Sequence, residues 1–149
     1  MIEALAALEE TGLAQHLKAS QWTYPLVNAG HVAGIGLLLG AVVPMDLRLL
    51  GWVRGPDVAA TVAFLRPFAA AGLILAASCG AMLFVTQAGD YVGNGWFRLK
   101  IALLAAALLN AALHRRLAAA PKARQRRAAA ISLSLWPAVL LSGRMIGYS

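Results

Sequence analysis

Residues 19–45 read ASQWTYPLVNAGHVAGIGLLLGAVVPM, a long apolar run with no Asp, Glu, Lys or Arg and a single histidine, His31. A helix needs about 20 mostly apolar residues to cross the roughly 30 Å of hydrocarbon in a bilayer. This stretch is long enough by itself, so it predicts a membrane-spanning helix. The whole chain fits a lipid environment, because 60% of its residues are hydrophobic, 13% are charged and its mean hydropathy is +0.70.

Three further runs predict three more spans. The second run contains no charged residue, whereas the third must include Arg98 and Lys100, and the fourth Arg144, to reach spanning length. No repeat or linker divides the 149 residues. The predicted fold is therefore all-α, a single integral membrane four-helix bundle over residues 1–149. The four spans are expected at about residues 21–47, 66–89, 95–116 and 127–148.

The first residues differ from the spans, because Glu3, Glu9, Glu10 and Lys18 interrupt their apolar side chains. This pattern predicts an amphipathic helix over about residues 2–18 that lies along the membrane interface. A cleaved signal peptide is not expected, since the start is acidic and has no continuous apolar core. Ser20 is expected to cap the first span.

The basic residues are distributed unevenly around the spans. Four of the thirteen Lys and Arg residues lie on the side of the termini, namely Lys18, Arg98, Lys100 and Arg144. The other nine lie between spans one and two or between spans three and four: Arg48, Arg54, Arg66, Arg115, Arg116, Lys122, Arg124, Arg126 and Arg127. The positive-inside rule then predicts a bacterial inner-membrane protein with both termini in the periplasm. Because topology accounts for the net charge of +7, nucleic-acid binding is not expected.

Small residues recur at a spacing of four in the first two spans. The pairs Gly30 with Gly34 and Gly36 with Gly40 lie in the first span, and Gly72, Ala76 and Gly80 lie in the second. This spacing is typical of close contacts between membrane helices. The alternative hypothesis is that some of these glycines, Gly34 among them, leave room for a flat cofactor.

An ionisable residue within a membrane is costly and therefore points to function. His31 is expected about 13 Å below the outer boundary and His114 about 27 Å below it, so the two cannot hold one haem. At the depth of His31 the second span places Cys79 and Met82. Imidazole with a sulfur ligand suits haem iron or Cu(I). Ordinary apolar packing of Cys79 and Met82 is the alternative, as is a hydrogen bond from His31 to Asn28 or to a carbonyl of a neighbouring helix.

Arg98, Lys100 and Arg144 are expected within about 9 Å of the outer boundary. Long basic side chains can extend to the lipid headgroups, or these three can meet haem propionates above His31. At the inner side Asp46 and Arg48, with Arg66 across the loop, are expected to form an ion-pair cluster that fixes the helix ends. No nucleophile with a base, carboxylate pair or phosphate-binding loop supports a hydrolase or kinase.

The order of these motifs resembles an uncharacterised family of small bacterial four-helix membrane proteins. The resemblance is carried by residues 28–34 (NAGHVAG), 46–51 (DLRLLG), 91–100 (YVGNGWFRLK), 110–114 (NAALH) and 143–148 (GRMIGY). More distantly, the chain is similar to copper-resistance D membrane proteins and haem-dependent protoporphyrinogen oxidases. That resemblance implies that His31 corresponds to the haem or copper ligand and Lys100 to a lysine of the oxidases. Other polar residues of the oxidases are missing here.

Together these features predict a membrane protein that binds haem b through His31 and transfers electrons, with a quinol as candidate donor. If it is an enzyme, it is a haem-dependent membrane oxidoreductase. One alternative is a copper-handling protein that uses His31, Cys79 and Met82. Another is a cofactor-free structural subunit or anchor of a larger membrane complex. Glycine-rich faces also predict a homo-oligomer or a complex with a membrane or periplasmic partner.

Overall fold

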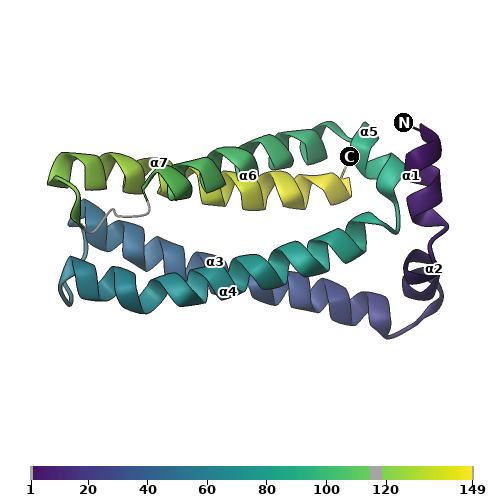
Figure 1. Cartoon of the computed structure of the whole chain (residues 1–149), viewed down its shortest axis with the longest axis horizontal. Coiled ribbons are helices and arrows are strands. Elements are labelled where there is room, and N and C mark those ends of the chain that lie inside the picture. Colours follow the sequence, from purple (N-terminus) through teal and green to yellow (C-terminus); the bar gives the residue numbers. More distant parts are fainter. Residues whose placement is uncertain (1, 115–118, 149) are drawn as a thin grey trace.

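The computed structural model describes residues 2–114 and 119–148, and over them the chain is helical with no strand (Figure 1). This confirms the predicted all-α class. Four of the helices are long and apolar enough to cross a membrane, so the chain is a multi-pass membrane protein. The elements are α1 (Ile2–Glu9), α2 (Gly12–Ala19), α3 (Thr23–Leu50), α4 (Val58–Phe84), α5 (Ala88–Gly93), α6 (Gly95–Leu113), α7 (Lys122–Met145) and the short 3-10 helix η2 (Ile146–Tyr148).

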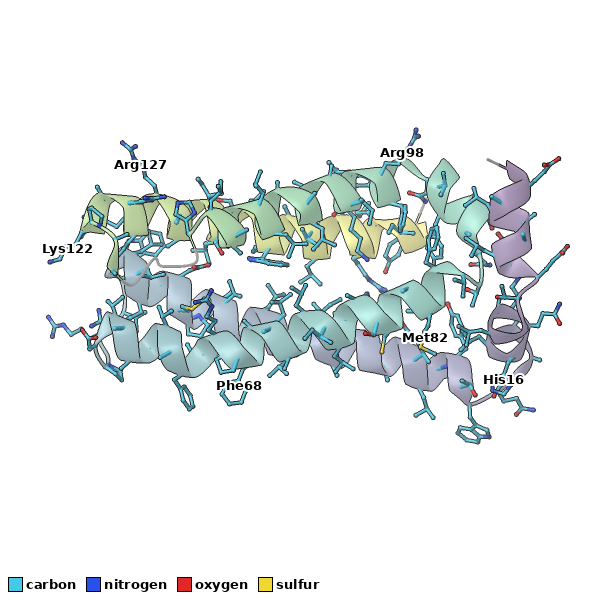
Figure 2. The ribbon with its side chains drawn as sticks, in the orientation of Figure 1. His16, Phe68, Met82, Arg98, Lys122 and Arg127 are labelled. Carbon is cyan, nitrogen blue, oxygen red and sulfur yellow. The ribbon has the colours of Figure 1, made fainter. Side chains whose placement is uncertain are left out.

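The four long helices form two antiparallel pairs. α3 packs against α4, α6 packs against α7, and α3 also contacts α7, which joins the pairs. Both ends of the chain lie at the same end of this bundle, as Figure 1 shows. We call this the terminal end, and the opposite end, which carries the α3–α4 connection, the loop end. Lys122 and Arg127 lie at the loop end and His16 at the terminal end (Figure 2).

The first span keeps nearly its predicted position. Its N-cap is Trp22, which makes no side-chain capping bond, so the predicted cap by Ser20 is wrong; the Ser20 hydroxyl still accepts a hydrogen bond from the Thr23 N–H at 3.1 Å. At the other end Gly51 adopts a left-handed conformation with φ 80°, and its N–H donates to the Arg48 carbonyl at 3.1 Å. Glycine suits this position because it lacks the Cβ that disfavours positive φ.

The second span differs from its predicted bounds, since α4 begins eight residues before residue 66 and ends five before residue 89. It starts early because Asp57 caps it, with its Oδ2 accepting from the Ala59 N–H at 2.9 Å. Pro67 lies inside the helix rather than at its start. With 27 residues α4 is about 40 Å long, longer than the hydrocarbon core, so its first turns and Arg66 can extend beyond it.

The third and fourth spans also shift slightly. α6 begins where the Asn94 side chain accepts from the N–H groups of Trp96 and Phe97, at 2.9 and 3.2 Å. It ends at Leu113, and the predicted extension to Arg115 and Arg116 falls outside the described residues. α7 starts after Pro121, five residues before the predicted start at residue 127. The basic residues in its first turns belong to the helix because a membrane helix can continue beyond its apolar run into the headgroup region.

The N-terminal segment forms two helices rather than the single one predicted. The chain breaks between α1 and α2, where the Thr11 hydroxyl donates to the Leu8 carbonyl at 2.7 Å and accepts from the Ala14 N–H at 3.4 Å. Thr11 thus ends one helix and caps the next, a local signal that hydropathy alone does not show. Ala14 and Leu17 of α2 are completely buried, so this segment covers the terminal end of the bundle.

The hydrophobic core lies between α3, α6 and α7. Its buried members are Leu38 and Val42 from α3, Ala107 from α6 and Trp136 from α7. Many other large apolar residues are exposed, such as Phe64 at 67% and Leu141 at 66%, as expected of side chains that face lipid.

Candidate functional site

His31 lies on the side of α3 that faces α4. Its Nδ1 is 2.7 Å from the carbonyl oxygen of Ala76, and the ring is half-buried. This is the hydrogen bond to a carbonyl of a neighbouring helix that the sequence offered as the alternative to a metal ligand. Asn28 is exposed and is not the partner.

The contact with Ala76 determines which nitrogen of His31 is free. A carbonyl oxygen can only accept, so Nδ1 carries the hydrogen and Nε2 of the neutral ring keeps its lone pair. In the part of the chain that the structure describes, Nε2 has no hydrogen-bond partner. A histidine that binds a metal through one nitrogen typically donates from the other to a carbonyl or carboxylate. The bond to Ala76 is therefore compatible with a metal at Nε2.

Gly80 provides the space for the His31 ring. A Cβ at residue 80 would lie 3.0 Å from Cε1 and 3.2 Å from Nδ1 of His31. These distances are shorter than ordinary van der Waals contacts, so the ring lies directly on the glycine. The spacing of small residues predicts Gly80 as a helix contact but not this role. The sequence of α4 alone does not show that His31 of α3 lies opposite Gly80.

Gly34 is a helix–helix contact, as the spacing of small residues predicted, and not part of a cofactor site. A Cβ at this position would be 2.5 Å from the backbone nitrogen of Ala76. The missing side chain therefore lets α4 approach, and the space is filled by protein rather than by a cofactor. By contrast, no other described part of the chain lies within 4 Å of such a Cβ at Gly36 or Gly40.

Lys100 turns into the bundle. A Cβ on Gly143 of α7 would lie 3.5 Å from its Cδ and 3.6 Å from its Nζ. The Lys100 side chain is half-buried. It lies close enough to His31 for the two groups to interact electrostatically. Lys100 makes no hydrogen bond or ion pair with any residue that the structure describes. A cation without a partner at this depth can receive an anionic group.

The two predicted arginines point elsewhere. Arg98 is exposed and extends away from the bundle, with its Nη2 3.5 Å from the Gly93 carbonyl (Figure 2). Arg144 is exposed as well, and it donates to the Tyr148 hydroxyl at 2.7 Å while lying 4.9 Å from the centre of that ring. The structure thus separates Lys100, which faces inward, from Arg98 and Arg144.

The sulfur residues lie on α4 near the same level. Cys79 is a half-buried free thiol whose Sγ would be 3.0 Å from a Cβ on Gly30. Met82 is also half-buried, toward the terminal end of α4 (Figure 2). Within residues 2–114 and 119–148, no group of three His, Cys, Asp or Glu side chains is arranged to hold a metal ion.

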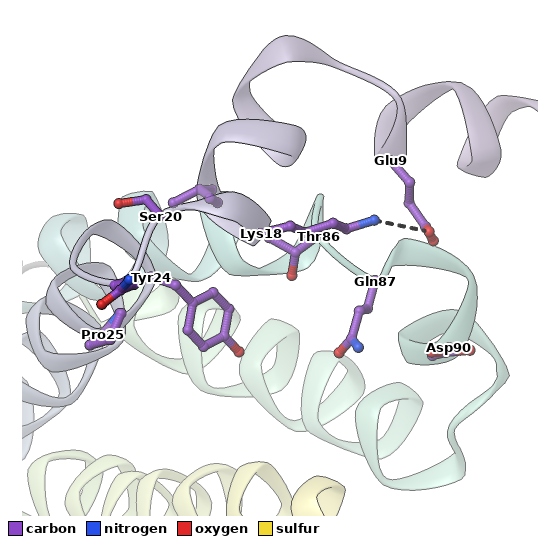
Figure 3. Close-up of a pocket in the computed structure, with 10 residues that line it drawn as sticks. Glu9, Lys18, Ser20, Tyr24, Pro25, Thr86, Gln87 and Asp90 are labelled. Carbon is purple, nitrogen blue, oxygen red and sulfur yellow. Dashed lines mark ion pairs between the residues drawn. The ribbon is translucent and has the colours of Figure 1, made fainter.

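A polar cavity of about 550 Å³ opens at the terminal end, between the N-terminal helices and the ends of α3 and α4 (Figure 3). Its lining combines acidic, basic and amide side chains from four segments of the chain. The lining side chains include those of Glu9, Lys18, Gln21, Tyr24, Gln87 and Asp90. Tyr24 precedes His31 by seven residues, two turns or about 10 Å on one face of α3, so the cavity lies above the histidine.

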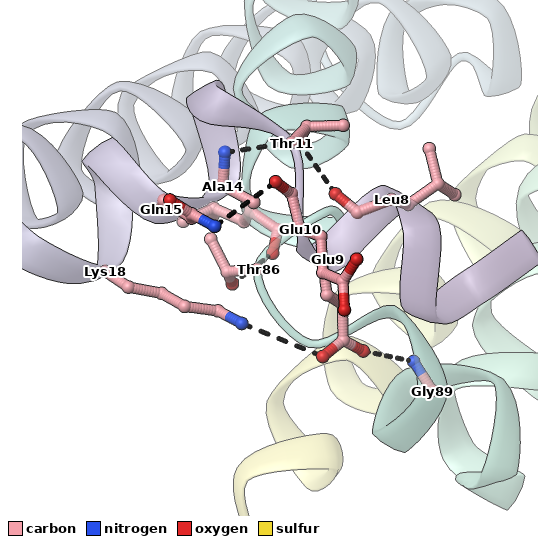
Figure 4. A network of polar contacts seen from close by, with 10 residues as sticks. Leu8, Glu9, Glu10, Thr11, Ala14, Gln15, Lys18, Thr86 and Gly89 are labelled. Atoms are coloured by element: carbon pink, nitrogen blue, oxygen red, sulfur yellow. Dashed lines mark hydrogen bonds and ion pairs between the residues drawn. The ribbon is translucent and has the colours of Figure 1, made fainter. Parts of the chain in front are cut away.

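Glu9 connects the cover of this cavity to the bundle. Its Oε1 accepts from the Gly89 N–H at 2.9 Å, and its Oε2 is 3.7 Å from Lys18 Nζ (Figure 4). The first contact links α1 to the start of α5, and the second links α1 to α2. This residue therefore holds the two N-terminal helices in place over the terminal end.

At the loop end, the predicted ion pair between Asp46 and Arg48 is wrong. Arg48 instead donates to the carbonyls of Pro56 and Gly55, at 2.8 and 3.4 Å, and so holds the α3–α4 connection. His114 Nδ1 lies 2.8 Å from the carbonyl of Asn110 in its own helix, far from His31 along the bundle.

Comparisons with known proteins give no relative, since no family model, curated protein or solved structure matches the chain.

Proposed function

We propose that the protein is a haem b protein of the bacterial inner membrane that transfers electrons, with Nε2 of His31 as an axial ligand of the iron. The observation that supports this most directly is the 2.7 Å contact between His31 Nδ1 and the Ala76 carbonyl. It holds the ring in one orientation and one tautomer, and it leaves a lone pair at Nε2 within a membrane-spanning helix. Imidazole is a common axial ligand of haem iron.

The residues near His31 suit this group. Lys100 supplies an inward-facing ammonium without a partner in the described chain, which can neutralise a propionate. Apolar helices exclude water, and Gly80 allows the ring to lie close to α4. Bound haem would supply one-electron chemistry, whereas the protein would orient the ligand and set the polarity of the pocket.

The proposed topology sets which end of the bundle faces each side of the membrane. Basic residues gather at the loop end, which the positive-inside rule assigns to the cytoplasm. The terminal end, with the cavity above His31, then faces the periplasm. We place the quinol donor in the bilayer beside the bundle and the acceptor on the periplasmic side.

The test is an absorption spectrum of the detergent-purified protein, oxidised and reduced. We expect a Soret band in the unmodified protein and in His114→Ala, and its loss in His31→Ala. His114 is a matched control, because it too bonds a carbonyl through Nδ1 but lies at the other end of the bundle. No Soret band in the unmodified protein, or one unchanged in His31→Ala, contradicts the proposal.

Metal analysis of the same samples separates the alternatives. Copper without porphyrin, lost in Cys79→Ser or Met82→Leu, would identify a copper-handling protein. No metal, together with stable co-purification of other chains, would identify a structural subunit.

A further inference from the structure

A buried carboxyl group without a charged partner lies in the loop-end half of the bundle. Asp46 of α3 is only 3% exposed, although it is an acidic residue in a membrane-spanning helix. Its Oδ2 is completely covered and has no hydrogen-bond partner among the described residues. It comes one turn after Val42, a member of the hydrophobic core. Such a position is costly for an ionised carboxylate.

The polar group that faces Asp46 comes from α7. The Ser132 hydroxyl lies within hydrogen-bonding reach of the Asp46 carboxyl group, and Ser132 is itself only 9% exposed. It lies one turn before Trp136 of the core, so the Asp46–Ser132 pair lies directly beside the apolar cluster on its loop-end side. One neutral hydroxyl cannot replace the hydration of a negative charge.

Three titratable residues at this end contact other groups, and Arg66 of α4 also has an interaction of its own. The Arg48 guanidinium on α3 bonds the carbonyls of Pro56 and Gly55. Arg126 on α7 lies near Gly51, where a Cβ would be 3.9 Å from its Nη2. On α6, His114 faces the Asn110 carbonyl, and the Asn110 amide donates to Ala128 of α7 at 3.1 Å. Within the described residues, Asp46 forms no ion pair, and its Oδ2 has no hydrogen-bond partner.

We propose that Asp46 is a proton-binding site, which takes up a proton and exchanges it with solvent at the loop end. One proton from water binds the carboxylate to form a neutral carboxylic acid, and no electron is transferred. The acid form removes the buried charge and gives one oxygen a hydrogen to donate. A metal cation fits less well, because hard cations need about six oxygen ligands and this site offers a carboxyl and a hydroxyl.

The route to solvent is short. Asp46 is four residues from Leu50, the last residue of α3, or about 6 Å along the helix. Beyond it lies the connection to α4, whose residues 51–57 are all exposed. The proton therefore exchanges with the side of the membrane that carries the basic loops. This inference depends on α3 and α7 alone and holds whether or not the protein binds haem.

Infrared spectroscopy of the purified full-length protein tests the proposal. Exposed carboxylates are ionised at neutral pH, so the C=O stretching band of a protonated carboxylic acid reports a buried acid. We expect one such band in the unmodified protein, a shift of this band in D₂O, and its loss in Asp46→Asn. Asp57→Asn is the matched control, because Asp57 is exposed and asparagine also caps helices, and we expect it to keep the band.

Ser132→Ala provides a second variant that keeps the carboxyl group. We expect it to retain the acid band at a shifted frequency, because the facing hydroxyl is gone. This keeps the proposal testable if Asp46→Asn does not fold. The proposal is overturned if the unmodified protein shows no acid band, if the band does not respond to D₂O, or if added sodium chloride removes it. The last result would assign a cation site instead.

Discussion

Gly34 and Gly72 lie backbone to backbone where α3 crosses α4. A Cβ on Gly34 would be 2.9 Å from the Gly72 carbonyl oxygen, and a Cβ on Gly72 would be 2.8 Å from the Gly34 carbonyl oxygen. Each added carbon would also come within 2.5 Å of a backbone nitrogen of the other helix, at Ala76 or Leu38. Backbone atoms cannot move aside as a side chain can, so this crossing requires glycine at both positions.

Replacing either glycine should therefore separate the helices. We expect Gly34→Ala and Gly72→Ala each to lower stability by about 1–3 kcal/mol, the usual cost of overpacking, with a lower thermal midpoint in detergent. Gly36→Ala and Gly40→Ala are the controls, because no neighbouring helix in residues 2–114 and 119–148 comes within 4 Å of a Cβ there. Equal losses of stability in all four variants would contradict a specific role of Gly34 and Gly72 at the helix crossing.

Gly80→Ala should disturb His31 without removing it. The added methyl group would lie 3.0 Å from Cε1, so the ring must tilt and its bond to Ala76 must weaken. Nitrogen NMR of labelled protein reports which ring nitrogen of His31 is protonated. We expect one tautomer in the unmodified protein and a mixture in Gly80→Ala, whereas Gly36→Ala should match the unmodified protein. An unchanged spectrum in Gly80→Ala would show that the ring does not lie on the glycine.

Glu9 should contribute more to the terminal-end cover than Lys18 does. Its bond to the Gly89 N–H is charge-assisted and short at 2.9 Å, whereas an exposed ion pair such as that with Lys18, at 3.7 Å, is worth about 0.2–1 kcal/mol. The Lys18–Glu9 pair is of the second kind, with side chains 44% and 30% exposed. We expect Glu9→Ala to speed hydrogen exchange across residues 2–19 more than Lys18→Ala does. A larger effect of Lys18→Ala would reverse this ranking.

Tyr91 should make the protein sensitive to alkaline pH. Burial, and then the neighbouring Tyr24, raises the pKa of the Tyr91 phenol in the folded protein. The unfolded chain then loses this proton first, at about pH 10. The stability that depends on it is complete below that pH and is lost as the pH rises through the folded pKa.

We therefore expect Tyr91→Phe to reduce the fall in thermal midpoint between neutral pH and pH above 10. Phenylalanine preserves the ring contacts with Phe84 and Phe97, whose centroids lie 6.1 and 5.4 Å from that of Tyr91. Tyr148→Phe is the control, because Tyr148 is 68% exposed. An alkaline fall of the same size in Tyr91→Phe would exclude this phenol as its cause.

Hydropathy predicted the spans well because it measures a local property, the length of an apolar run. It placed α3 within three residues at each end but missed the start of α4, where Asp57 caps a helix that carries Arg66 and Pro67. It also missed the break at Thr11, since one hydroxyl ends α1 and begins α2. Capping depends on single side chains, which an average over a window does not resolve.

The order of apolar and charged residues was enough to predict a membrane protein with four spans and with both termini on one side, and to single out His31 as an ionisable residue within a span. The tertiary structure decided what each of these residues contacts. Gly34 and Gly36 lie in the same apolar run, yet only Gly34 meets another helix. Likewise, only the packing of α3 on α4 and α7 gives His31 a carbonyl partner and leaves Asp46 without a charged one. The physical reason is that the composition of a helix decides whether it lies in lipid or in water. Which side chains meet depends on where two helices cross.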